Sequence, residues 1–188
     1  GLGDVYKRQG VWNYKKYIGI PKGILKKYPD RIKLVSGDFS PCDGVYLIPH
    51  KTPGLEKKGI REHMYLKEKR RWRPDSFSHE QSLVFDTPDG LVIFNSCSHG
   101  GADTIIREVT ATFPDKKVKA LIGGFHLYNK TDAEILALAE GIRSTGISEI
   151  YTGHCTGDHA FDLLKETLGE SVHKLHAGLC LLYTSDAA

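Results

Sequence analysis

The sequence has few of the features that mark membrane, secreted or nucleic-acid-binding proteins. Its uninterrupted apolar runs are only a few residues long, far below the ~18 residues that span a bilayer. No charged segment followed by an apolar one opens the chain, so we do not expect a secretory signal. The net charge is only +3 and both signs are mixed, which does not favour a nucleic-acid partner.

Cysteine and methionine are also scarce. The four cysteines are irregularly spaced, which argues against a disulfide scaffold and favours a reducing, cytoplasmic location. A length of 188 residues with 40% hydrophobic content is typical of one globular domain. The chain has one methionine but nine histidines, and the histidines are its most informative residues.

The two ends of the chain differ from the rest. Residues 1–9 (GLGDVYKRQ) and 181–188 (LLYTSDAA) resemble translated sequencing-adapter sequence at the edges of reading frames from environmental DNA. Neither string has a sustained hydrophobic period or a cap that would anchor it to a core. We therefore expect both to be non-native tails outside the fold, and the natural protein to extend further at its N-terminal side.

Residues 10–74 are basic, rich in glycine and proline, and weakly periodic. Short strands are expected at residues 32–35 and 44–48. The charge run at 67–73 (KEKRRWR) is interpreted as a solvated loop or helix face. The alternative for this run is an anion-binding patch for a phosphorylated or carboxylated substrate.

After Pro74 the pattern alternates between strands and helices, which predicts an α/β fold with helices packed on a sheet. Pro-Asp-Gly at 88–90 favours a tight turn between two strands. A threonine followed three residues later by glutamate, at 131 and 134, is a helix capping box. The expected elements are strands at 82–86 and 91–95, a helix at 102–113, a strand at 118–122, a helix from 131, a strand at 149–152, a helix capped by Asp158, and a strand at 172–175.

Three histidines occupy equivalent places in this pattern. His99, His126 and His154 each follow the end of an expected strand and lie near glycine. Loops of this kind gather at one edge of a sheet that has helical crossovers, and ligand sites form there. Neutral imidazole is the commonest metal ligand, and catalytic zinc sites use about three protein ligands plus a water. The spacing therefore predicts a metal site, although a single histidine after a strand is more often a hydrogen-bonding residue.

Other residues near these loops are open to two interpretations. Cys97 and Cys155 could bind zinc or act as nucleophiles, but small buried residues beside the site are favoured. His159 starts a helix or serves as an outer or alternative ligand. The remaining histidines are interpreted as structural: His50, His63, His79, His173 and His176. A Gly-x-Ser-x-Gly elbow, a P-loop and a dinucleotide fingerprint are absent from the sequence.

The ordered motifs resemble those of metallo-β-lactamase-fold metallohydrolases. The matching segments are DSFSHEQSLVF at 75–85, CSHGG at 97–101, GGFHL at 123–127 and GHCTG at 153–157. They are most like the 7,8-dihydropterin-6-methyl-4-(β-D-ribofuranosyl)-aminobenzene-5′-phosphate synthase-like branch. The resemblance implies a four-layer αββα sandwich, of which residues 10–180 form a partial domain and 10–74 a branch-specific insertion. It also implies that His99 is the third metal-binding motif, His154 the last ligand and His126 a further ligand or site residue.

One departure from the family is large. The His-x-His-x-Asp-His motif is absent, and no two histidines are spaced His-x-His. With the adapter-like start, this predicts a fragment that comprises the C-terminal part of the sandwich. We expect such a fragment to be inactive alone and poorly folded, because one sheet would lose its partner.

The function that follows is a metal-dependent hydrolase. The parent protein is expected to hold one or two divalent ions, zinc first, and to use metal-bound hydroxide on an anionic ester or phosphoester-like small molecule. Neither nucleic acid nor a membrane is expected as a partner. The alternatives are a synthase of the same fold that joins pterin-type and phosphoribosyl-type substrates, and a non-enzymatic binding domain with a degenerate site.

Overall fold

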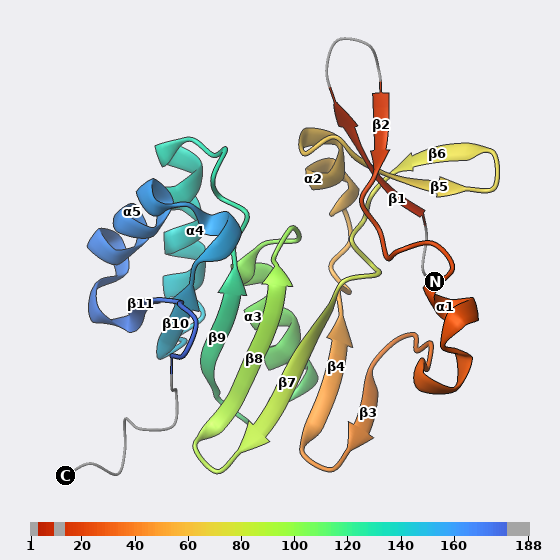
Figure 1. The fold of residues 1–188 in the computed structure, drawn as a ribbon. Helices are drawn as coiled ribbons and strands as arrows, with labels where there is room; N and C mark the ends of the chain where they lie inside the picture. The colour runs from red at the N-terminus through yellow and green to blue at the C-terminus, as the bar shows by residue number, and fades with distance from the viewer. Residues whose placement is uncertain (1–3, 10–13, 180–188) are drawn as a thin grey trace. The chain divides into compact units, whose positions relative to one another are not determined.

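The structure is a computed structural model that describes residues 4–9 and 14–179. The chain divides into two compact units, residues 1–85 and 86–188. Both units contain strands, drawn as arrows in Figure 1, and buried side chains.

The first unit is built from antiparallel strands. One sheet has the order β2-β1-β5-β6, and the strands β3, β4 and β7 pair in sequence next to one another. Leu55, Met64 and Phe77 form a small buried cluster in this unit. The elements are β1 (Asp4–Gln9), β2 (Tyr14–Tyr17), α1 (Ile24–Lys27), a 3-10 turn (Pro29–Arg31), β3 (Phe39–Cys42), β4 (Val45–Pro49), α2 (Glu56–Arg61), β5 (Met64–Glu68), β6 (Arg71–Pro74) and β7 (Gln81–Thr87).

Several expectations for this unit need correction. The strand expected at 32–35 is wrong: these residues join no ladder, and the strand begins at Phe39. The charge run at 67–73 is not a loop or helix face but a β-hairpin, with Lys69 in the turn at φ 53°. The rings of Trp72 and Tyr6 pack in a T-shaped arrangement with their centroids 4.9 Å apart.

The expected tails have different outcomes. Asp4–Gln9 form strand β1, which pairs with β2 and β5, so this segment lies in a sheet and not outside the fold. Its non-native origin stays a prediction. The expected tail at 181–188 lies outside the described residues. The assignment of 10–74 as an insertion also stays a prediction.

The second unit contains a parallel sheet of order β11-β10-β9-β8. Buried aliphatic side chains on strands and helices form its core, among them Leu91, Ile93, Leu121 and Ile150. The strands and helices alternate as the sequence predicts: β8 (Gly90–Cys97), α3 (Ala102–Thr112), β9 (Val118–Gly124), α4 (Asp132–Arg143), β10 (Glu149–Thr152), a 3-10 turn (His154–Thr156), α5 (Asp158–Leu168), a 3-10 turn (Gly169–Ser171) and β11 (Val172–Lys174).

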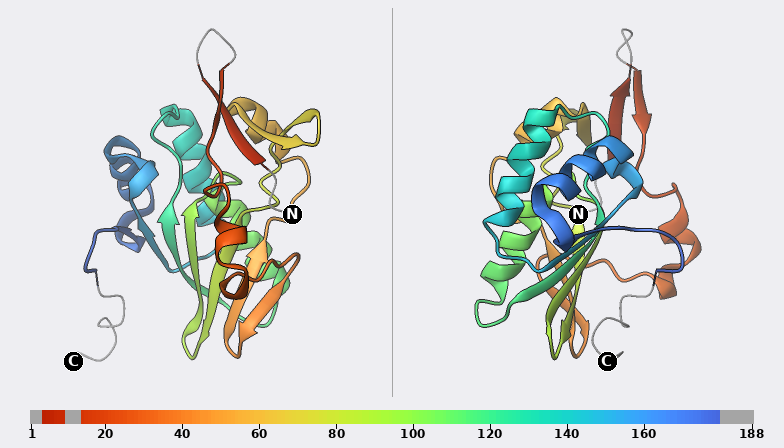
Figure 2. Two further views of the ribbon diagram at one scale, coloured as in Figure 1. Left: turned by 45° about the vertical axis from the view of Figure 1, so that its right-hand side comes forward. Right: turned by 90° about the vertical axis from the view of Figure 1, so that its left-hand side faces the viewer.

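The three helices of the second unit pack in series, α3 on α4 and α4 on α5. The right-hand view of Figure 2 shows them together on one side of their strands. Arg107 of α3 donates to the carbonyl of Gly141 in α4, and Arg143 of α4 donates to the carbonyl of Thr167 in α5. With the helices on one side, the loops at the carboxyl ends of the strands are left to build the site.

The two predictions made for helix N-termini have opposite outcomes. The capping box is confirmed, since Thr131 Oγ1 accepts from the Glu134 amide and Glu134 accepts from the Thr131 amide. The cap expected from Asp158 is wrong, because Gly157 is the N-cap residue of α5, at φ 80°. The Asp158 carboxylate instead accepts from Lys174 Nζ at 2.7 Å.

Replacing Thr131 with alanine should lower the free energy of unfolding by about 1 kcal/mol, because the first turn of α4 loses its side-chain acceptor. Urea unfolding followed by circular dichroism measures this change. Thr131→Ser keeps the hydroxyl and serves as the control, with an expected change close to zero. Equal losses in both variants would mean that the hydroxyl bond contributes nothing to stability.

No helix among the described residues is long and apolar enough to cross a bilayer.

Candidate metal site

The three predicted histidines all lie in the second unit, each two residues past the end of a parallel strand. His99 follows β8, which ends at Cys97; His126 follows β9; and His154 follows β10. Because β8, β9 and β10 are adjacent and parallel, their carboxyl ends meet at one edge of the sheet. The expected convergence of the three loops is therefore present in the fold.

The backbone at two of these positions is strained. His126 has φ 51° and His154 has φ 52°, in the left-handed region that non-glycine residues rarely adopt. Such a conformation costs about 1–2 kcal/mol and persists only where surrounding contacts hold it. Strained residues of this kind cluster at functional sites, and here the conformation occurs in two of the three histidine loops.

His99 and His126 lie next to one another. Their ring centroids are 4.5 Å apart, and one ligand atom from each, together with Cys97 Sγ, form a group in which all atoms lie within 4.8 Å. His126 is buried, while His99 and Cys97 are half-buried. The rings of Tyr128 and His126 form a T-shaped pair with their centroids 5.1 Å apart. This group therefore offers two imidazole nitrogens and one sulfur to a single point.

His154 belongs to a second group, with Cys97 and Cys155. His154 is exposed and the two cysteines are half-buried. The sulfurs of Cys97 and Cys155 are 3.2 Å apart. Among the described residues, the groups of this spacing number two and Cys97 is in both, so the three histidines come together by way of a cysteine and not as a trio by themselves.

Cys155 lies in an environment that favours its thiolate form. The hydrogen bond with Cys97 lowers the pKa of the Cys155 thiol most. Burial opposes this change, but hydrogen bonds and the charge from His126 add to it, and the pKa falls to about 4. The backbone N–H of His126 donates to Cys155 Sγ at 3.3 Å.

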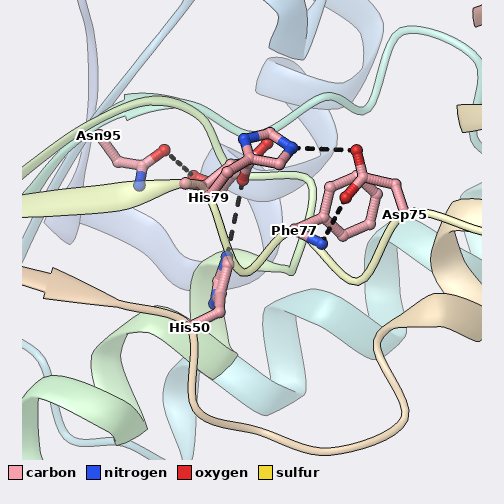
Figure 3. Close-up of polar contacts among 7 residues, drawn as sticks. His50, Asp75, Phe77, His79 and Asn95 are labelled. Atoms are coloured by element: carbon pink, nitrogen blue, oxygen red, sulfur yellow. Dashed lines mark hydrogen bonds and ion pairs between the residues drawn. The ribbon is translucent and has the colours of Figure 1, made fainter. Parts of the chain in front are cut away.

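Hydrogen bonds fasten the three loops to one another. Thr156 Oγ1 accepts from the Phe125 amide at 3.0 Å, and the carbonyl of Cys155 accepts from the Leu127 amide at 3.1 Å. The Ser98 amide donates to the carbonyl of Gly124 at 2.8 Å. Ser98 Oγ also donates to Asn95 Oδ1 at 3.5 Å, a contact drawn in Figure 3. The ligand-bearing loops are thus held in place by backbone and side-chain hydrogen bonds.

The donor set fits a transition metal. Mixed histidine and cysteine ligands suit zinc and neighbouring ions, whereas magnesium, calcium and manganese prefer oxygen. The sequence favoured small buried neighbours for the two cysteines, whereas the structure leaves both half-buried with their sulfurs in the candidate ligand groups. The signal was present: Cys97 ends a strand and Cys155 follows His154, within the same loops as the histidines.

Two other histidines of the second unit are engaged elsewhere. His159 Nε2 contacts Asp132 Oδ1 at 2.7 Å between the exposed faces of α5 and α4, so the outer-ligand interpretation has no support from its position. His173 Nε2 contacts Glu149 Oε2 at 2.6 Å, and its ring stacks on Tyr151 at 4.7 Å. Both are surface pairs between neighbouring elements.

A separate polar cluster lies in the first unit. Asp75 is fully buried, and its carboxylate accepts from the Phe77 amide at 2.7 Å and contacts His79 Nε2 at 3.0 Å (Figure 3). His50 Nε2 lies 3.6 Å from Glu80 Oε2 nearby. Burial lowers the pKa of His79, but the hydrogen bond with Asp75 and the charges of Asp75 and Glu80 outweigh burial and the opposing charge of His50. The net result is a raised pKa for His79.

Comparison with solved structures shows which fold the chain has. No protein-family model matches the chain. The crystal structure of Tm1679, described as a metal-dependent hydrolase of the beta-lactamase superfamily, superposes with a TM-score of 0.80 at 26% identity. The match covers 95% of this chain and 66% of that one. The chain therefore has the metallo-β-lactamase fold, as its motifs indicate.

Comparison of sequences finds a curated protein that is similar to part of the chain. The 7,8-dihydropterin-6-methyl-4-(β-D-ribofuranosyl)-aminobenzene-5′-phosphate synthase of Methanocaldococcus jannaschii is 34% identical over 115 residues. That match covers 61% of this chain and 39% of the synthase, so this chain matches about two fifths of the relative's length. The resemblance to the synthase-like branch is confirmed, and both relatives are enzymes.

Proposed function

We propose that the protein represented by this chain is a metal-dependent hydrolase in which His99, His126 and His154 are metal ligands. The observation that carries the proposal is their common position, two residues past the ends of three adjacent parallel strands. Zinc is the ion that this donor set suits best. We also propose a cytoplasmic location, since few cysteines are spread irregularly along the sequence.

The substrate proposed is a small anionic ester or phosphoester. A bound divalent ion supplies Lewis acidity and a water of lowered pKa. In the net reaction the oxygen of water bonds to the carbonyl carbon or phosphorus, and the bond to the leaving oxygen breaks. One proton from water ends on the leaving group and the other is released to solvent.

The residues of the chain itself would orient the ion and the substrate. His126 is buried and its backbone is fastened to the 154–156 turn, so its imidazole is held with little freedom. His154 is exposed, which leaves one side of the site open to a substrate. Tyr128 is 57% exposed and its ring packs on that of His126.

A second candidate is the synthase reaction, which the curated relative supports. In that case the same ligands would serve to join a pterin-type substrate to an aminobenzene ribofuranosyl phosphate. Incubation of the longest natural version of the protein with each substrate class, followed by mass spectrometry, separates the candidates. A condensation product supports the synthase, and cleavage of chromogenic phosphoesters or carboxylic esters supports the hydrolase.

Metal binding by the 188-residue chain tests the part that both candidates share. His99→Ala or His154→Ala should weaken zinc affinity by at least ~10-fold to 100-fold, because loss of even an outer partner of a ligand costs that much. Competition with a chromogenic chelator gives the affinity, and elemental analysis gives the stoichiometry.

The control for this measurement is His176→Ala, which removes an exposed histidine outside both ligand groups. Zinc affinity should not change in this variant. Zinc binding that is unchanged in His99→Ala and in His154→Ala would refute the proposed ligands. Circular dichroism of each variant shows whether it keeps the fold.

A further inference from the structure

Cys97 occupies a special place among the ligand candidates of the second unit. It belongs to the group with His99 and His126 and also to the group with His154 and Cys155. A residue that is common to both groups lies where ligands from all three loops can meet. The role of its sulfur therefore decides how the histidines act together.

The distance between the two sulfurs excludes a disulfide and is close to the spacing of two ligands on one metal ion. A disulfide brings two sulfurs to about 2.05 Å, and two thiolates on one tetrahedral zinc lie about 3.8 Å apart, given Zn–S bonds of about 2.3 Å. The observed 3.2 Å is about twice as far from the disulfide distance as from the spacing of two ligands. The two thiols are hydrogen-bonded to one another, with either sulfur as the donor. The pair is therefore not a disulfide, and its sulfurs lie within about 0.6 Å of the spacing of two ligands of one ion.

The backbone creates the room for this pair. A Cβ on Gly124 would lie 2.6 Å from Cys155 Sγ and 2.9 Å from the carbonyl oxygen of Ser96, so only glycine leaves space for the sulfur. Gly124 is the register partner of Cys97 on the neighbouring strand. The same glycine therefore allows β8 and β9 to run together up to the site and allows Cys155 to reach Cys97.

Both the backbone carbonyl and the side-chain sulfur of Cys155 accept hydrogen bonds. Its carbonyl accepts from the amides of Leu127 and Tyr128, and its sulfur accepts from the amide of His126. A side chain fixed in this way loses little further freedom when it binds an ion, which is the preorganisation that metal sites require.

We propose that Cys97 and Cys155 are thiolate ligands of the metal that this site binds, with Cys97 as the ligand common to both groups. The inference rests on the proposed function and deepens it. Each thiol releases its proton to solvent when it binds the ion. Two sulfur ligands make the site selective for zinc, cobalt or iron over magnesium, calcium or manganese.

Cobalt(II) titration of the reduced 188-residue chain tests the proposal, because sulfur-to-cobalt charge transfer gives an intense near-ultraviolet band that nitrogen ligands do not give. The wild-type chain should show this band. Cys97→Ser and Cys155→Ser should each lose roughly half of its intensity, since each removes one of two sulfur ligands. Cys42→Ser is the matched control, because Cys42 is an exposed cysteine of the first unit and its loss should leave the band intact.

A second measurement needs no variant. Alkylation of the wild-type chain with iodoacetamide, mapped by mass spectrometry, should be slowed at Cys97 and Cys155 by stoichiometric zinc. Cys42 should react equally with and without zinc and is the internal reference.

The outcomes separate this inference from the function on which it rests. Visible cobalt absorption without the sulfur band would overturn the thiolate ligands and leave the histidine site in place. Failure to bind cobalt and zinc at all would overturn both. Equal alkylation of Cys97 with and without bound zinc would overturn the inference even if the serine variants fail to fold.

Discussion

Asp75→Ala should lower the free energy of unfolding by about 3 kcal/mol, a large share of the stability of a small domain. The Asp75 carboxylate is fully buried and binds both the Phe77 amide and His79. Phe77 itself has φ 55°, a strained conformation for an aromatic residue, and its side chain is in the cluster with Leu55 and Met64. Loss of the carboxylate thus removes two hydrogen bonds and the restraint on a core residue.

Urea unfolding of the chain at neutral pH measures this effect. Asp75→Asn keeps one acceptor oxygen without the charge and should give an intermediate loss. Asp38→Ala is the matched control, because Asp38 is an exposed carboxylate that pairs with Lys51, and such pairs contribute about 0–1 kcal/mol. A loss for Asp75→Ala no larger than for Asp38→Ala would contradict the structural role of the buried carboxylate.

The loss of unfolding free energy in Asp75→Ala should also depend on pH, in a direction set by the protonation of His79. The folded-state pKa of His79 is raised above its ordinary value of 6.5, by Asp75 and Glu80 against burial and His50. The stabilisation from the charged pair is therefore complete below the unfolded pKa and is lost as the pH rises through the folded pKa. The variant should lose more stability at pH 6 than at pH 9, and the reverse order would show that the pair is not an ion pair.

Gly123→Ala should destabilise the second unit by about 1–3 kcal/mol and weaken metal binding with it. A Cβ at this position would lie 2.2 Å from the carbonyl oxygen of Asn95, which is backbone of the neighbouring strand β8. A flexible side chain could move aside at small cost, but the backbone of a strand that ends at Cys97 and leads into the His99 loop cannot. The two strands would separate at the end where the ligand loops begin.

Thermal unfolding and zinc affinity of Gly123→Ala check this prediction together. Lys119→Ala, on an exposed position of the same strand, is the control and should change stability by less than about 0.5 kcal/mol. If Gly123→Ala were as stable as Lys119→Ala and bound zinc with unchanged affinity, the close approach of β8 and β9 would not matter to the site.

The prediction of the second unit succeeded where local signals were strong. The apolar run 118–122 lies in a buried strand, the strand expected at 149–152 is present, and the Thr131 capping box starts a helix, because these features act within a few residues. The failures have causes that lie further along the chain. Residues 32–35 have a strand-like composition but find no partner strand, and Asp158 is used by Lys174 while glycine takes the cap.

The sequence alone determined the alternation of strands and helices in residues 82–175 and, through it, the three histidine loops at one sheet edge. These follow from periodicity and from the rule that parallel strands share a carboxyl edge. Only the tertiary structure decided that Cys97 and Cys155 meet, because they are 58 residues apart. Their contact depends on the register of β8 with β9, on the space at Gly124 and on the left-handed turn at His154, none of which a single sequence displays.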